Sequence, residues 1–467
     1  MPPQIALFAI LAYILWLMRK DVRYRNGVSS ALWAVVVWMV VIGSRPVSTW
    51  FDFGGEAGSA AEAYDEGNPF ERLIYFFLMA FGLYVLSRRG VRLNQVIKSN
   101  RWLFIFFLYW GLSVLWSDAP LVAFKRWIKD MGNIVMVLVV LTEQEPLEAV
   151  RAAFARCAYV LVPLSVLFIR FYSNLGRAFH TWTGEMMYTG VATHKNTLGA
   201  LVMVCGLFCL WDLSERLRDK SRPSGRAGLV GYLCLMLMTL WLLYQAHSAT
   251  SSGCAVLGAA LFFGLRLRAV QARLGHLEWY GFGIGFMFWF LNSVVDVAHF
   301  VVVDVFGRDM NLTTRTEVWP MLLQKSDSFL LGSGFNSFWS GDRLAEIYDK
   351  LGIIQAHNGY LETFLNGGLL GVLLLIILIF SAGGNIKNEL LAGTEFARVR
   401  LMFLAIGVVY NCTEAAFNKM GLIWFAFLVV IIQYPERSAA HLATGQFANP
   451  AEADDSRNPE PSSPCVA

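Results

Sequence analysis

The chain has 467 residues, of which 56% are hydrophobic, 15% charged and 14% aromatic. A soluble domain usually contains about 25% charged residues and about 45–50% apolar residues, so this composition excludes an ordinary water-soluble domain. It also excludes a disordered chain and a small disulfide scaffold. The formal net charge of +4 by itself indicates no partner, and no nucleic acid is expected. The composition predicts a membrane protein, in which each membrane-spanning helix needs ~20 apolar residues.

Apolar runs bounded by charged or turn-forming residues predict about thirteen membrane spans and thus an all-α, polytopic helix bundle. The runs lie near residues 4–18, 30–44, 73–87, 102–116, 131–142, 157–169, 189–211, 228–247, 253–265, 279–303, 365–383, 399–415 and 420–434. The first run is followed by its basic cluster and has no small-residue cleavage site, so we expect a span there and not a signal peptide. The membrane domain is expected to cover residues 1–434, and the polar tail, residues 435–467, is expected to be disordered and cytoplasmic.

Lysine and arginine are unevenly divided between alternate loops. Of the 38 basic residues, 24 fall in one set of loops and the tail, and 14 fall in the other set. Because cytoplasmic loops are enriched in Lys and Arg, the first set is expected inside the cell. The long loop over residues 304–366 is then expected on the outer side, with short helices in it. Loops of this length in a compact protein are usually functional.

The long outer loop contains a helix-start signal at Arg315. Thr314 and Glu317 form a capping box, and hydrophobic residues follow at helical spacing. Arg315 is therefore expected at or near the first helical position, where free backbone amides and a guanidinium together suit a phosphate. The alternative is an interfacial Arg whose side chain reaches lipid headgroups.

The same loop ends with His357, which is followed by Asn358, Gly359 and, a few residues later, an apolar run. An imidazole on the outer side just before a span is suited to act as general base toward a sugar hydroxyl. The alternative is a turn histidine that caps a helix. Glu414 lies near the outer end of a later run, and carboxylates within spans are often functional.

Further cations lie in outer segments, where few are expected because Lys and Arg are enriched in cytoplasmic loops. A polyanionic or pyrophosphate ligand would explain this excess, and contact with lipid headgroups is the alternative. They include Arg126, Arg177, His194 and Lys195. The segment around Arg126 is equally compatible with an interfacial anchor in which Trp127 joins the aromatic belt. The sequence has no Walker motif, no HExxH and no Asp cluster for Mg²⁺, so a metal-dependent mechanism is disfavoured and no cofactor is expected.

Four motifs in chain order resemble the O-antigen ligase and polymerase family, and the His-Lys-Asn-x-Leu-Gly form is similar to its exopolysaccharide-production branch. The motifs are residues 190–199, 314–319, 331–338 and 357–362. The resemblance covers roughly residues 70–435. It implies a GT-C-like, metal-independent, inverting glycosyltransferase in the bacterial inner membrane, with its active site facing the periplasm. The implied partners are an undecaprenyl-pyrophosphate-linked glycan donor, a glycan or lipid A core acceptor, the lipid bilayer and other polysaccharide-export proteins.

The resemblance also implies roles for individual residues. Arg315 is expected to contact the pyrophosphate, and His357 is expected to act as the base or to orient the acceptor. Substrate binding is expected of Lys195, His194, Arg177, Arg126 and Glu414. Polymerase and ligase activity both stay open. A lipid-linked oligosaccharide flippase or other polysaccharide transporter is the alternative, and broken helices with charges near mid-span would indicate it. A structural subunit would leave the outer cations unexplained.

Overall fold

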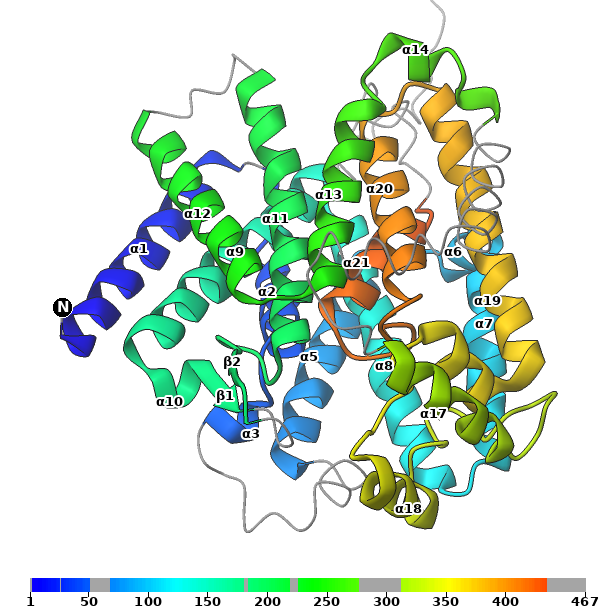
Figure 1. Ribbon diagram of the computed structural model, residues 1–467. Coiled ribbons are helices and arrows are strands. Elements are labelled where there is room, and N and C mark those ends of the chain that lie inside the picture. The colour runs from blue at the N-terminus through cyan, green and yellow to red at the C-terminus, as the bar shows by residue number, and fades with distance from the viewer. Residues whose placement is uncertain are drawn as a thin grey trace, which may run out of the picture.

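The computed structural model describes residues 2–25, 27–50, 68–179, 184–218, 226–276 and 312–434. These ranges form the all-α, polytopic bundle expected from the sequence (Figure 1). The helices of the bundle are α1 (Pro3–Tyr24), α2 (Leu32–Gly43), α5 (Pro69–Arg88), α7 (Arg101–Leu112), α8 (Pro120–Leu141), α9 (Pro146–Phe171), α11 (Lys195–Arg218), α12 (Arg226–Gln245), α13 (Ala249–Gly264), α19 (Gly359–Leu391), α20 (Glu395–Tyr410) and α21 (Leu422–Ile431). The helices that connect them are α3 (Val47–Trp50), α6 (Leu93–Ser99), α10 (Ser173–Gly176), α14 (Arg268–Gln271), α17 (Leu312–Gln324), α18 (Gly341–Leu351), and the 3-10 turns Ser113–Trp116 and Leu274–His276.

Five helices of the described residues are long and apolar enough to cross a membrane. They are Pro69–Arg88, Pro146–Phe171, Lys195–Arg218, Gly228–Gln245 and Gly359–Leu391. Several shorter helices, such as α2 and α21, are also apolar. Twelve of the thirteen predicted spans coincide with a helix, and the run near residues 279–303 lies outside the described residues. The chain is thus a multi-pass membrane protein.

Some predicted boundaries are wrong because helices continue past the charged residues that delimit apolar runs. The helix α8 begins at Pro120, so the basic residues near 125–129 lie in its first turns and not in a loop. Likewise, α9 begins at Pro146, and its Arg156 is buried and paired with Asp21 at 2.8 Å. The predicted long loop also ends earlier than residue 366, because α19 begins at Gly359.

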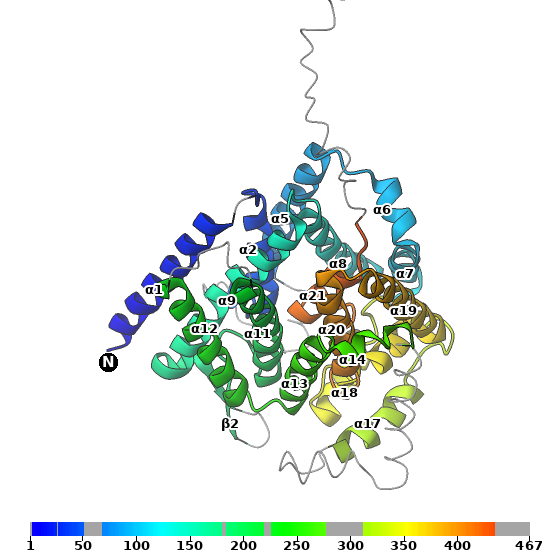
Figure 2. The ribbon, with the colours of Figure 1, turned by 90° about the horizontal axis from the view of Figure 1, so that it is seen from above.

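The bundle is organised around α9 and α11, with α1 and α5 at the periphery (Figure 2). The helix α9 contacts α1, α2, α8, α11 and α12. At the end predicted to face the cytoplasm, Arg25 bonds to Asp21 at 2.7 Å, Glu148 at 3.0 Å and Asp212 at 3.0 Å. Buried charges are stable only when paired, so this cluster ties the peripheral α1 to α9 and α11.

The predicted outer loops gather at the opposite end of the molecule, at the bottom of Figure 1. They include α17, α18 and a small antiparallel hairpin that the sequence did not predict, formed by β1 (Arg177–Phe179) and β2 (Met186–Tyr188). The helix α17 begins at Leu312, two residues before the predicted cap Thr314, so Arg315 is the fourth residue of its first turn.

The helix α19 is broken near its outer end. Gly368 has φ +58°, which a right-handed helix does not allow. The loop 329–334 lies against the break, where Leu369 N donates to Phe329 O at 2.9 Å and Gly334 N donates to Asn366 O at 2.8 Å. The backbone groups that lose their helical partners at the break are therefore hydrogen-bonded to this loop. The first segment of α19 can then run in a different direction from the rest of the helix.

We expect Gly368→Ala to destabilise the protein, because a Cβ there would lie 2.3 Å from Leu330 C and the left-handed φ would be strained. The expected cost is about 1–3 kcal/mol. Gly384→Ala, in the same helix, is the matched control, since its Cβ would meet nothing within 4 Å. The measurement is thermal unfolding of both variants in detergent. An equal midpoint for the two would contradict the proposed tight contact.

Candidate functional site

Three segments that are far apart in the chain meet at the outer end of the bundle. They are the turn before α19, the connection between α20 and α21, and the first turn of α11. Hydrogen bonds between side chains of these segments join them directly. The site is therefore a product of the tertiary fold and not of a local motif.

His357 and Glu414 form the centre of this site. The Nδ1 atom of His357 lies 3.2 Å from Oε2 of Glu414, and the other oxygen, Oε1, accepts a hydrogen bond from Asn196 at 2.8 Å. Glu414 is buried, whereas a quarter of the His357 side chain is exposed. When Nδ1 donates to the carboxylate, the neutral ring presents Nε2 as a proton acceptor. The pair thus has the arrangement of a general base with its orienting acid.

The backbone around His357 is tightly held. His357 has φ +51°, and Asn358, not His357, caps α19 through bonds from Tyr360 N and Leu361 N, both at 3.0 Å. The interpretation of His357 as a capping residue is therefore wrong. Gly359 N donates to both Asn411 O at 2.8 Å and Glu414 O at 2.9 Å. These bonds bring the turn of His357 against the segment that carries Glu414.

A second polar network lies beside the first. Glu362 accepts from Ala356 N at 3.0 Å, from Trp339 at 2.8 Å and from Lys419 at 3.2 Å. Lys419 also donates to Gln355 Oε1 at 3.3 Å, and Gln355 Nε2 lies 3.3 Å from His357 Nδ1. The Gln355 side chain therefore lies between the Glu362–Lys419 ion pair and His357, and it donates to Nδ1 only in the tautomer in which Nδ1 does not donate to Glu414.

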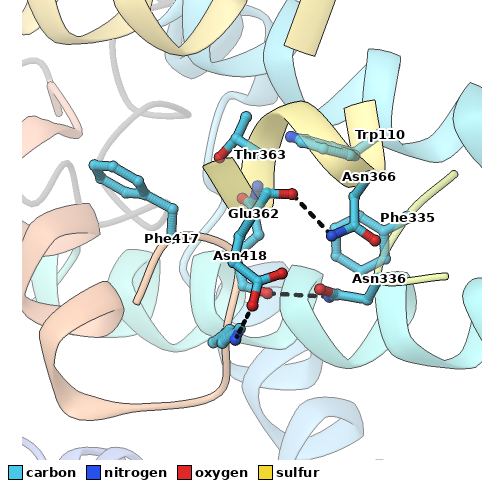
Figure 3. Close-up of a pocket in the computed structure, with 9 residues that line it drawn as sticks. Trp110, Phe335, Asn336, Glu362, Thr363, Asn366, Phe417 and Asn418 are labelled. Atoms are coloured by element: carbon cyan, nitrogen blue, oxygen red, sulfur yellow. Dashed lines mark hydrogen bonds and ion pairs between the residues drawn. The ribbon is translucent and has the colours of Figure 1, made fainter. Parts of the chain in front are cut away.

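Figure 3 shows the small pocket next to this network. Glu362 and Asn366 face it from α19, Asn336 from the loop before α18, and Asn418 from the loop before α21. Asn336 Nδ2 donates to Asn418 O at 3.2 Å, and Asn366 Nδ2 donates to Glu362 O at 2.8 Å. Its volume of about 10 Å³ suits one water molecule, so it is too small for a sugar in this conformation.

The motif at residues 194–199 builds the start of α11. His194 Nδ1 accepts from Asn196 N at 3.2 Å, and Lys195 is the first residue of the helix. A Cβ at Gly199 would lie 2.7 Å from Ser251 Oγ, so only glycine allows this approach to α13. The motif thus places the Asn196 side chain against Glu414.

The remaining predicted residues lie in different places. Arg177 donates to Ile169 O at 3.1 and 3.0 Å, and it packs over Tyr188. It therefore joins the end of α9 to the hairpin, and within the described ranges no contact joins it to His357. Arg126 donates to Asn336 O at 2.5 Å and so touches the loop that borders the small pocket. Arg315 lies in the first turn of α17.

Sequence reasoning missed Lys419 as a site residue. It is one of the 14 basic residues of the outer set, in a short connection between two apolar runs, so the charge count contained the signal. Among the described residues, no group of three or more His, Cys, Asp or Glu side chains is suited to hold a metal ion. The expectation of a site without metal or cofactor stays a prediction.

The comparisons with known proteins agree with the motifs. Residues 186–376 match the family model described as O-antigen ligase. The chain is also similar to the exopolysaccharide production protein ExoQ of Rhizobium meliloti (strain 1021), with 26% identity over 311 residues. The alignment covers 62% of this chain and 66% of ExoQ, which is slightly less than two thirds of that relative. Both findings support the O-antigen ligase and polymerase family.

We expect the Glu362–Lys419 pair to be energetically coupled. Glu362 is buried, and removal of Lys419 would leave its carboxylate without a counter-charge. A double-mutant cycle with Glu362→Gln and Lys419→Met should give an interaction free energy of about 1–3 kcal/mol. The exposed Glu346–Lys350 pair of α18 is the control and should show a clearly smaller coupling. The measurement is thermal or denaturant unfolding, and equal coupling in both pairs would contradict this role.

Proposed function

We propose that the protein is a membrane glycosyltransferase of polysaccharide biosynthesis, of the O-antigen ligase and polymerase family that its motifs and matched region support. It transfers a lipid-linked glycan to a hydroxyl of a second sugar, with His357 as general base. The donor is an undecaprenyl-pyrophosphate-linked glycan, and the acceptor is a growing glycan or lipid A core. The protein lies in the bacterial inner membrane with this site on the periplasmic side.

The observation that carries the proposal is the contact of His357 with Glu414, supported by Asn196. It joins two of the motifs that indicate the family, residues 190–199 and 357–362, around one ionisable ring. The buried carboxylate accepts the Nδ1 proton and so fixes the ring in the tautomer in which Nε2 can take a proton.

The reaction then requires one base and one anion-stabilising group. The acceptor hydroxyl attacks the anomeric carbon of the donor sugar, and its proton passes to His357 Nε2. The bond from the anomeric carbon to the phosphate oxygen breaks, and the electron pair leaves with the lipid pyrophosphate. Cations must meet this charge in a site without metal. We assign this work to Arg315 in the first turn of α17 and to Lys195 at the start of α11.

The other predicted binders take different parts in this proposal. Glu414 acts through His357 and is a positioning residue. His194 caps the first turn of α11, and Arg177 holds the hairpin against α9. The described part of the outer segment, residues 312–358 with α17 and α18, precedes α19 in the chain, and we expect the tail after residue 434 not to be needed for the chemistry.

The transporter alternative has one feature in its favour, the break in α19. The backbone groups at this break are bonded to the loop 329–334, however, and Asn366 also holds Phe338 N at 3.0 Å. Discontinuous helices of transporters use such groups to bind ions or substrates. Here they hold the loop of residues 329–338, which borders the small pocket beside the site, and this favours the enzyme.

We expect His357→Ala to reduce glycan transfer by about 10²–10⁴-fold, the usual contribution of a general base. Arg315→Ala should also abolish long-chain surface polysaccharide, and Glu414→Gln should cause an intermediate loss, since the carboxylate acts only through the ring. Each variant should be expressed and inserted normally. The measurement is the amount and length of surface polysaccharide in a complemented deletion strain. His276→Ala, at the opposite end of the molecule, is the matched control.

Wild-type polysaccharide from both His357→Ala and Arg315→Ala would overturn the assignment of the site. Normal polysaccharide from Glu414→Gln with a loss in His357→Ala would restrict the role of the carboxylate to structure.

The deletion strain should also distinguish polymerase from ligase. If the protein is a polymerase, single repeat units accumulate on lipid A core. If it is a ligase, full-length chains stay on undecaprenyl pyrophosphate. Gel analysis of both lipid fractions is the measurement, and an unchanged pattern in both would contradict the proposed function.

A further inference from the structure

Arg45 lies in the connection between α2 and α3, at the outer end of the bundle (Figure 1). Its guanidinium donates to backbone carbonyl oxygens of other segments. They are Val191 O at 3.3 Å from Nε, and Gly190 O at 2.7 Å, Ala192 O at 3.3 Å and Leu175 O from Nη2. The backbone N–H of Arg45 also donates to Val191 O at 2.8 Å. One residue thus binds the three successive carbonyl groups of residues 190–192.

The segment of residues 189–192 needs such partners, because it is buried and belongs to no helix or strand. Gly190 has φ +55°, and a Cβ there would lie 2.8 Å from Ser165 Cβ. The N–H groups of the segment are bonded to the end of α9 and to α10, with Gly190 N donating to Gly176 O at 3.0 Å and Val191 N donating to Ser165 Oγ at 3.3 Å. Arg45 supplies the donors for its carbonyl groups.

This segment leads directly into the first turn of α11. His194 Nδ1 accepts from Asn196 N at 3.2 Å, and Asn196 Nδ2 donates to Glu414 Oε1 at 2.8 Å. The other oxygen of Glu414 lies 3.2 Å from His357 Nδ1. The carbonyl groups that Arg45 binds are therefore only four to six residues before the amide that supports the carboxylate of the site.

The Arg45 side chain is itself held in place by Trp50. Its Cζ lies 5.1 Å from the centroid of the Trp50 ring, and Trp50 Nε1 donates to Arg45 O at 3.2 Å. The Trp50 ring packs against Phe168 of α9, with 5.4 Å between the ring centroids. A guanidinium is planar and presents its donors in a fixed fork, so a stacked arginine holds several acceptors in one geometry. The contact between Arg45 and residues 190–192 is therefore rigid.

We propose that Arg45 is a positioning residue for the transfer reaction. By binding the carbonyl groups of residues 190–192 it fixes the start of α11, and through Asn196 it fixes the Glu414–His357 contact. The inference rests on the proposed function. An arginine that bound a substrate phosphate would direct its donors at that phosphate, whereas Nε and Nη2 of Arg45 are bonded to carbonyl oxygens of the chain itself.

The first test measures glycan transfer by the full-length protein in nanodiscs, with lipid-linked glycan extracted from the deletion strain as donor. Arg45→Met should lower kcat by about 10²-fold, which a small displacement of a catalytic group can cost, and should leave KM for the donor unchanged. Arg45→Lys should behave like Arg45→Met, because an ammonium lacks the planar fork. Arg170→Met is the matched control, since it removes an outer arginine that lies over Trp241.

The same kinetics contain the contrary outcomes. A raised KM for the donor with an unchanged kcat, or full activity in Arg45→Lys, would make Arg45 a charge that binds the donor and would overturn the inference. Each variant is compared only if it elutes as the wild type in size-exclusion chromatography, and Arg45→Gln serves where Arg45→Met does not fold.

A double variant tests whether Arg45 acts through Asn196. Asn196→Ala should lower kcat by itself, and Arg45→Met added to it should cause little further loss, because the contact with Glu414 is already absent. Losses that multiply in the double variant would show that the two residues act independently, and the inference would fail.

Hydrogen exchange gives a measurement that does not depend on transfer. In Arg45→Met, the amides of residues 189–198 and of the peptide that contains Glu414 should exchange faster than in the wild type, whereas peptides around Arg25 at the opposite end should not change. Unchanged exchange at residues 189–198, or faster exchange over the whole chain, would contradict a positioning role.

The variant His357→Ala separates the inference from the proposed function. If it keeps transfer, the proposed base is wrong, and exchange in the Glu414 peptide still decides the role of Arg45. If it loses transfer while Arg45→Met keeps full kcat, the proposed function stands and the inference fails.

Discussion

The candidate site depends on one physical requirement, that backbone polar groups near the hydrocarbon find hydrogen-bond partners within the protein. The break in α19 at Gly368 frees such groups, and the loop 329–334 bonds to them. This arrangement separates the first segment of α19 from its long membrane segment. The N-terminus of that first segment is held by Asn358 and by the bonds of Gly359 to the segment of Glu414. The position of His357 is a consequence of these bonds.

The charged residues form different kinds of network at the two ends of the bundle. One end has the buried cluster around Arg25, which is fully paired and joins α1 to α9 and α11. The other end has smaller networks, the Glu414–His357 contact and the Glu362–Lys419 pair, which leave a ring partly exposed. The first arrangement suits stability, and the second suits chemistry at a surface. The basic residues Lys125, Arg126 and Lys129, near the start of α8, belong to this second end.

Much of the candidate site could be named from the sequence, since His357, Glu414 and the motif at residues 194–199 were all selected there, and their roles stay predictions. Their contacts could not be predicted, because Asn196 and Glu414 are 218 residues apart and no local pattern links them. The role of Arg177 was not predicted for a related reason. Its guanidinium donates to Ile169 O at the end of α9, and this contact exists only because the hairpin folds back onto that helix. Lys419 was counted among the outer cations, but its partner Glu362 lies in α19, 57 residues away in the chain.

The sequence by itself determined the class of the protein, the order of its spans and the sidedness expected of its loops, because hydrophobic runs and the distribution of Lys and Arg are local properties. It did not determine where helices begin. The basic residues of α8 lie between two apolar runs of the sequence, yet they belong to a helix, in which Lys129 packs over the Tyr75 ring. The tertiary structure also decided which polar residues meet. Pairing in a low-dielectric interior depends on distances across the bundle, which the linear order of the residues does not contain.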